Sequence, residues 1–220
     1  MCKFLSAVFT QDGRLFCDPE HTDSHSDLIA ANKIHERDKP GVAQKFVRLE
    51  LVPDEKWSTP DKWTECVDEH EVPAWFDPDA RAKAFGQMRA IAAAMFIETG
   101  EREILLGGCW ILRGNVAILE ARSTRIVSMY GSSKVVSMYG SSNVVSMYGS
   151  SKVVSMYDSS NVGSMYDSSN VGSMYDSSNV GSMSGSSNVG SMSGSSNVGS
   201  MSGSSNVVSM YGSSKVVSMY

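Results

Sequence analysis

The sequence has few cysteines and no pairing pattern among them. Cys2, Cys17, Cys66 and Cys109 lie far apart, and none has the CxxC spacing of a zinc site or a redox pair. A disulfide framework in a small secreted protein needs denser cysteines. We therefore expect a protein of a reducing compartment, the cytoplasm, with no metal ion or other cofactor.

Long apolar runs are also missing. No stretch approaches the roughly 18 apolar residues that a membrane-spanning helix requires. The apolar stretch near the N-terminus is interrupted by Ser6 and ends at Gln11-Asp12-Gly13, which is too short for a signal peptide followed by a cleavage site. The sequence thus predicts no membrane partner.

Basic residues are too few to attract nucleic acid. The chain has 19 Lys and Arg against 24 Asp and Glu, a net charge of −5. Residues 126–220 have no net charge, because three lysines balance three aspartates there. These charged residues are Lys134, Lys152, Lys215, Asp158, Asp167 and Asp176. The first 125 residues therefore carry the whole negative charge, and since phosphate binding depends on Lys and Arg, no nucleic-acid partner is expected.

What the chain does contain is a strict internal repeat of nine residues from Ile126 onward. Its fifth position is occupied in turn by Tyr130, Tyr139, Tyr148, Tyr157, Tyr166, Tyr175, Ser184, Ser193, Ser202, Tyr211 and Tyr220. The template is Val-(Val/Gly)-Ser-Met-(Tyr/Ser)-(Gly/Asp)-Ser-Ser-(Asn/Lys), with ten complete units and a half unit. Repeats of fixed length indicate a stacked architecture.

The unit reads as a strand followed by a turn. Val-Val-Ser-Met-Tyr favours an extended strand, and (Gly/Asp)-Ser-Ser-(Asn/Lys) favours a turn. Two units make an 18-residue coil, so residues 126–220 predict a β-solenoid of about five coils. A disordered linker is disfavoured because Val and Met stay in phase, and calcium is disfavoured because only three turns contain Asp.

Stacked copies of one position share one environment, which separates the interior from the surface. The constant first, third, fourth, seventh and eighth positions are expected to face the core or close the turn. The core residues predicted in this way are Ile126, Met129, Val135, Met138, Val144, Met147, Val153, Met156, Val162 and Met165.

The variable second, fifth, sixth and ninth positions are expected to face water. The tyrosines then form two stacked ladders, one on each face of the solenoid. The ladders either stiffen the sheets or offer an aromatic binding strip. Ice binding is disfavoured because regular threonine pairs are absent.

Residues 1–112 predict a small α+β head, and residues 113–125 a degenerate first coil that is one residue short. The predicted strands are Lys3–Thr10, Arg14–Cys17, Lys45–Val52, Lys62–Asp68, Ile104–Leu106 and Trp110–Leu112. One helix is expected from Ser26 to Lys33. A second is expected to begin at Asp77-Pro78, run to about Ile97 and stop at Gly100.

Several segments of the head support a resemblance. They are Lys3-Phe4-Leu5-Ser6-Ala7-Val8, Thr22-Asp23-Ser24-His25-Ser26-Asp27-Leu28-Ile29, Phe46-Val47-Arg48-Leu49-Glu50, Val67-Asp68-Glu69, Pro73-Ala74-Trp75-Phe76 and Gly107-Gly108-Cys109-Trp110. With these segments the chain resembles uncharacterised phage, prophage and gut-metagenome proteins that carry a small head followed by tandem GSSKV or GNSTV repeats. The resemblance implies a phage or prophage origin and no particular activity.

Three groups of residues are candidates for chemistry. His21, Asp23, His25 and Asp27 would share one face of an extended strand as metal ligands, but the same segment is also typical of a helix N-terminus, which we favour. Cys2 could act as an N-terminal nucleophile, although no base-bearing motif accompanies it.

The acidic run 68–71 could contact a basic partner, although such a run is more often a polar loop. We therefore expect no catalytic residues and no metal site.

The sequence is best interpreted as a non-enzymatic structural or interaction protein. No helix or charged segment follows Tyr220, so we expect homo-oligomers that pair through the C-terminal coil. The alternatives are an anti-defence protein that sequesters a host protein or a small nucleotide signal, and, with less support, an enzyme in the head.

Overall fold

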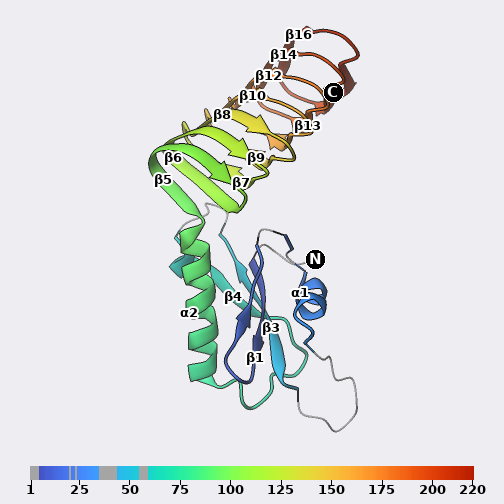
Figure 1. The fold of residues 1–220 in the computed structure, drawn as a ribbon. Helices are drawn as coiled ribbons and strands as arrows, with labels where there is room; N and C mark the ends of the chain where they lie inside the picture. The colour runs from blue at the N-terminus through green and yellow to red at the C-terminus, as the bar shows by residue number, and fades with distance from the viewer. Residues whose placement is uncertain (1–4, 20, 23, 35–43, 55–58) are drawn as a thin grey trace. The chain divides into compact units, whose positions relative to one another are not determined.

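The structure, a computed structural model, describes residues 5–19, 21–22, 24–34, 44–54 and 59–220. The chain divides into an N-terminal unit, Met1–Met95, and a solenoid unit, Phe96–Tyr220 (Figure 1). The division lies earlier than residue 112, where the sequence placed the end of the head. The reason is that Phe96–Leu106 is a strand that pairs in parallel with the next strand of the solenoid.

The N-terminal unit holds a four-stranded antiparallel sheet in the order β2-β1-β3-β4. Its elements are β1 (Leu5–Thr10), β2 (Leu15–Phe16), α1 (His25–Ala31), β3 (Phe46–Val52), the 3-10 helix η1 (Pro60–Lys62), β4 (Thr64–Val67) and α2 (Pro78–Ala94). No helix in the described part of the chain has the length and apolar character needed to cross a membrane.

Both helices begin at side-chain caps. Ser24, rather than Ser26, caps α1 and accepts a hydrogen bond from the backbone N–H of Asp27. Asp77 caps α2 by accepting from the N–H of Ala80 at 2.9 Å, with proline in the first turn. Helix α2 ends three residues before the expected Ile97, which instead belongs to a strand of the solenoid.

The side chains of β3 alternate between the two faces of this sheet, and a helix covers each face. Val47, Leu49 and Leu51 are fully buried on one face, which α2 covers with Phe85 and Met88. The opposite face is covered by α1, whose Leu28 and Ile29 pack against Val8 and Phe46. The second face therefore contains the polar residues of β3, Arg48 and Glu50, next to a helix N-terminus.

The solenoid unit contains 13 strands that form about seven turns. They are β5 (Phe96–Leu106), β6 (Cys109–Arg122), β7 (Arg125–Met129), β8 (Lys134–Tyr139), β9 (Asn143–Met147), β10 (Lys152–Met156), β11 (Asn161–Met165), β12 (Asn170–Met174), β13 (Asn179–Met183), β14 (Asn188–Met192), β15 (Asn197–Met201), β16 (Asn206–Met210) and β17 (Lys215–Met219). The first part of β6 pairs with β7 and its second part pairs with β8. Strand β6 therefore bends once and contributes to both sheets of the solenoid.

Each later strand pairs in parallel with the strand two positions further on, which confirms two nonapeptide units per coil. Val144 pairs with Val162, 18 residues later. The coil before the repeats is one residue shorter, because Ile118 pairs with Val135. Every position thus lies above its own copy.

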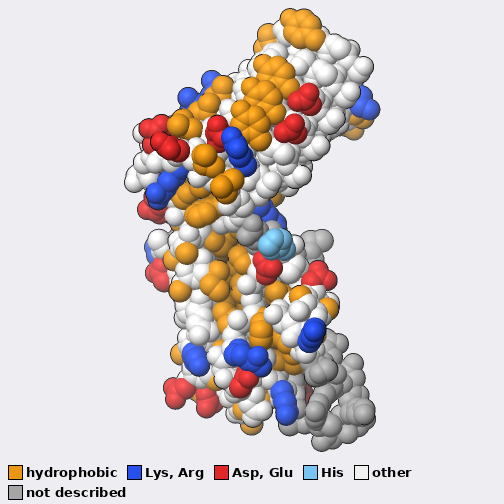
Figure 2. All heavy atoms as spheres, viewed as in Figure 1, with side chains coloured by type: hydrophobic (Ala, Val, Ile, Leu, Met, Phe, Trp, Pro, Cys, Tyr) orange, Lys and Arg blue, Asp and Glu red, His pale blue; other side chains and the backbone are white. Residues whose placement is uncertain are grey.

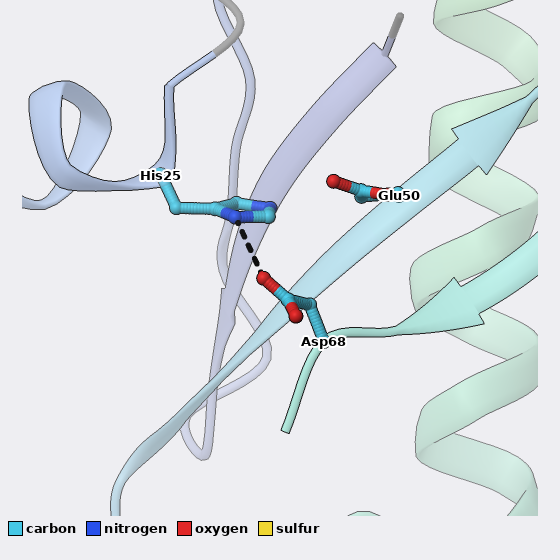
Figure 3. A group of neighbouring side chains, drawn as sticks. All are labelled: His25, Glu50 and Asp68. Atoms are coloured by element: carbon cyan, nitrogen blue, oxygen red, sulfur yellow. Dashed lines mark ion pairs between the residues drawn. The ribbon is translucent and has the colours of Figure 1, made fainter. Parts of the chain in front are cut away.

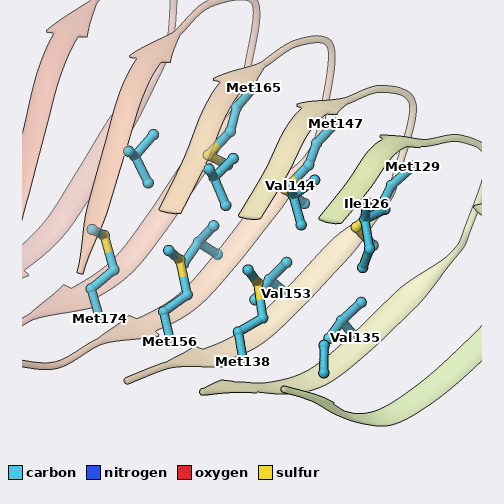
Figure 4. Packing of buried hydrophobic residues seen from close by; sticks show 14 of the residues in the cluster. Ile126, Met129, Val135, Met138, Val144, Met147, Val153, Met156, Met165 and Met174 are labelled. Carbon is cyan, nitrogen blue, oxygen red and sulfur yellow. The ribbon is translucent and has the colours of Figure 1, made fainter. Parts of the chain in front are cut away.

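The interior is a column of one apolar pair per unit, drawn in Figure 4. The structure places all ten core residues named from the sequence in this column with 0% exposure: Ile126, Met129, Val135, Met138, Val144, Met147, Val153, Met156, Val162 and Met165. The unbranched methionine adapts to the narrow space between the two faces.

The third position of the unit departs from its predicted inward direction. The first and fourth positions both point inward, so the strand cannot alternate strictly, and the pairing skips the second position. In the regular coils the third-position serine is half-buried and points outward, as in Ser164 and Ser182, whose hydroxyls lie 3.1 Å apart. The two residues between two inward side chains must both turn away from the core.

The backbone conformation at the sixth position of the unit explains why only glycine and aspartate occur there. Its φ angle is positive in every complete turn, for example +67° at Gly131 and +58° at Asp158. Among residues with a side chain, Asn and Asp tolerate this left-handed conformation best. The backbone of the turn therefore selects the residue, and solvent exposure alone does not.

Substitutions at Gly149 test this requirement. Gly149→Val should lower the free energy of unfolding by about 1–2 kcal/mol, because its φ of +66° is costly for a branched side chain. Gly149→Asn should cost less, because asparagine tolerates this conformation. Urea denaturation followed by circular dichroism measures both, and equal losses in the two variants would contradict the account.

Candidate functional site

The tyrosines form two stacked ladders, one on each side of the solenoid. Tyr130, Tyr148 and Tyr166 belong to one ladder, with ring centroids 4.9–5.0 Å apart and interplanar angles of 6–7°. The second ladder consists of Tyr139, Tyr157 and Tyr175, with the same spacing. Figure 2 shows apolar rings stacked in a stripe over part of the solenoid, with acidic side chains beside it.

The ladders are surface features of limited length. Tyr166 and Tyr175, the last rings of the two stacks, are 38% and 37% exposed. Three serines follow at the same position, Ser184, Ser193 and Ser202, before Tyr211 and Tyr220. Each ladder is therefore a rigid strip of three rings, whose faces are covered by one another and whose edges meet solvent.

An arginine continues one of the ladders. Arg122 pairs in register with Tyr139, and its guanidinium carbon lies 5.6 Å from the centroid of that ring. Glu120 forms an ion pair with the same guanidinium. The strip thus presents a cation followed by three aromatic rings.

The turn aspartates tie neighbouring coils together. Asp158 accepts a hydrogen bond from the N–H of Gly140 at 2.9 Å, and Asp167 accepts one from Gly149 at 3.0 Å. Asp176 accepts likewise from the N–H of Asp158. Each of these carboxylates thus accepts a hydrogen bond from a main-chain amide, which gives it a structural role in the turn.

The proposed strand of alternating ligands around His21 is not formed. His21 pairs with Asp18, with ring Nδ1 2.9 Å from Oδ1, whereas Asp27 accepts from the hydroxyl of Thr22 at 3.0 Å. His25 begins α1 and points into the unit. Asp23 lies outside the described residues. The helix-cap interpretation of this segment is confirmed.

Two other candidates from the sequence were Cys2 and the acidic run 68–71. Cys2 lies outside the described residues. In the acidic run, Glu69 accepts from the backbone N–H of Arg48 at 2.8 Å, and Asp68 lies 3.5 Å from His25. The first two carboxylates of the run therefore make contacts within the unit, while His70 and Glu71 are exposed.

One group of residues was missed from the sequence. His25, Glu50 and Asp68 come together from α1, β3 and the segment after β4, with one potential ligand atom of each within 4.8 Å of the others. Glu50 lies on the face of β3 opposite Leu49 and Leu51, and it is only 8% exposed. No spacing in the sequence links three residues that only the antiparallel sheet brings together.

The contribution of the ladders to stability can be measured by changing their length. Tyr148→Ser breaks two ring contacts and should lower the free energy of unfolding by about 1–3 kcal/mol, at 0.5–1.5 kcal/mol for each aromatic pair. Ser184→Tyr adds a ring beside Tyr166 and should raise it by about 0.5–1.5 kcal/mol. Denaturant titration provides both values, and a Ser184→Tyr variant less stable than the parent would contradict the stacking account.

No protein-family model, curated protein or solved structure matches this chain. The functional assignment therefore rests on the chain's own residues and their geometry.

Proposed function

We propose that this chain is a non-enzymatic, phage-associated structural or interaction protein of the host cytoplasm. Its solenoid presents repetitive tyrosine and serine surfaces, and it self-associates through the coil formed by β16 and β17. The resemblance of the head segments to phage and prophage proteins supports the origin, and the low cysteine content supports the compartment.

The observation that carries self-association is the exposed apolar surface of that coil. Met210 is 42% exposed and Met219 is 73% exposed, whereas every methionine at this position from Met129 to Met192 is 0–1% exposed. Val208 and Val217 of the same strands are each 63% exposed. The two methionines, whose counterparts fill the interior elsewhere, thus meet solvent here beside the outward-facing valines, which indicates a contact surface.

The opposite edge of the solenoid differs in chemistry. Strand β5 carries Glu98, Glu101, Arg102 and Glu103, all of them exposed. Charged side chains on an edge strand discourage pairing with another chain. The contrast favours β16 and β17, where Lys215 is the one charged residue of the two strands.

A second copy of this chain is the partner that fits this surface best. Within each chain, the coil formed by β16 and β17 covers β14 and β15. The same coil of a second copy has the residues needed to cover β16 and β17 in turn. A two-fold arrangement would place β16 and β17 against the same strands of the second copy and pair their outer main-chain groups. Such a pairing would cover both methionines.

A double variant tests the proposal. Met210→Lys combined with Met219→Lys should shift the protein from dimer to monomer in sedimentation-velocity experiments at micromolar concentration, because two charges would have to be buried in the contact. Val145→Lys serves as the control, since Val145 is 36% exposed in the middle of the solenoid. The proposal fails if the parent chain is a monomer, or if the control dissociates it equally.

A further inference from the structure

Three polar side chains of the N-terminal unit converge on one point of its sheet, as Figure 3 shows. His25 comes from the start of α1, Glu50 from the middle of β3, and Asp68 directly follows β4. His25 and Glu50 are 5% and 8% exposed, whereas the side chain of Asp68 is 61% exposed. The group is therefore buried on one side and open to solvent on the other.

Glu50 is the unusual member of this group. The residue is more than nine-tenths buried, and among the described residues none forms a hydrogen bond or ion pair with its carboxylate. Its neighbour in register on β1 is Ser6, whose buried hydroxyl also lacks a hydrogen-bond partner there. A buried carboxylate without a partner is costly, so the fold retains a group that calls for a positive charge.

The orientation of His25 is fixed by the backbone. Its Nε2 lies 3.0 Å from the carbonyl oxygen of Leu49. Because a carbonyl oxygen only accepts, Nε2 must carry the proton and donate it. The other ring nitrogen, Nδ1, faces the carboxylate of Asp68 at 3.5 Å. A hydrogen bond from one ring nitrogen to a backbone carbonyl is the usual way in which a metal-binding histidine is oriented.

We propose that His25 Nδ1, Glu50 and Asp68 bind one divalent metal ion of the Zn²⁺ class. One imidazole nitrogen and two carboxylate oxygens form a ligand set that zinc accepts, with a remaining position for water or another ligand. The ion would neutralise the two carboxylates, including the unpartnered one of Glu50. Asp68, which is exposed, forms the entry side of the site.

The separation of the three groups agrees with this assignment. Their ligand atoms lie within 4.8 Å of one another. Ligands of a tetrahedral zinc ion at about 2.0–2.2 Å are roughly 3.3–3.6 Å apart. His25 Nδ1 and Asp68 Oδ2 already have this separation, at 3.5 Å, so closure around an ion would require the Glu50 carboxylate to approach them.

Metal titration of the full chain tests the site. After dialysis against a chelator and then chelator-free buffer, calorimetry with zinc sulfate should show one ion bound per chain. Glu50→Gln and Asp68→Asn, which preserve shape and remove charge, should each weaken binding at least about tenfold, in the range known for disturbed metal sites. His21→Ala is the matched control, because His21 is an exposed histidine of the same segment, and it should bind as tightly as the parent.

Thermal melting gives a second readout, in which the effect of Glu50→Gln on the melting temperature relative to the parent has opposite signs without and with zinc. Without metal, Glu50→Gln should melt at a higher temperature than the parent, because it removes the unpartnered charge. With saturating zinc the parent should gain stability and Glu50→Gln should not. The proposal is overturned by a parent that binds no zinc, by binding that persists in both charge-removing variants, or by a metal-free Glu50→Gln variant that melts lower than the parent.

Discussion

The solenoid depends on parallel main-chain hydrogen bonds between successive coils, which repeat every 18 residues. One Val and one Met per unit are too little apolar surface to fold a nine-residue segment, because the backbone entropy lost is larger. The bonds from each coil to the next supply the missing stability, as when Tyr148 N–H donates to the carbonyl of Met129 at 2.9 Å. Stability is therefore a property of the stack.

The same constraint creates the surface. Since every residue lies above its own copy, any side chain repeated in the sequence becomes a ladder. Tyrosines stack at about 5 Å, and asparagines bond in a row, with Asn179 donating to Asn161 at 3.1 Å. Charged side chains stack least favourably, because copies of the same charge repel one another. The aspartates nevertheless persist, because each carboxylate accepts a main-chain N–H of the preceding coil.

The sequence predicted what depends on local pattern and failed where distant segments meet. A strict period of nine, with strand and turn residues in fixed places, was enough to predict the 18-residue coil and the alternating ladders. It did not reveal that the third-position serine turns outward, since every constant position was expected to face the core or close the turn. Strand β5 was largely missed because its charged residues are typical of a loop. The group of His25, Glu50 and Asp68 depends on sheet pairing that no spacing in the sequence encodes.

Amide hydrogen exchange of the whole chain tests the central claim most directly. If main-chain bonds between coils hold the solenoid, amides of β9–β13 should exchange orders of magnitude more slowly than those of an unstructured peptide. Protection should decline toward β16 and β17, which are bonded on one side within the chain. Exchange as fast as in free peptide throughout residues 126–220 would contradict the account.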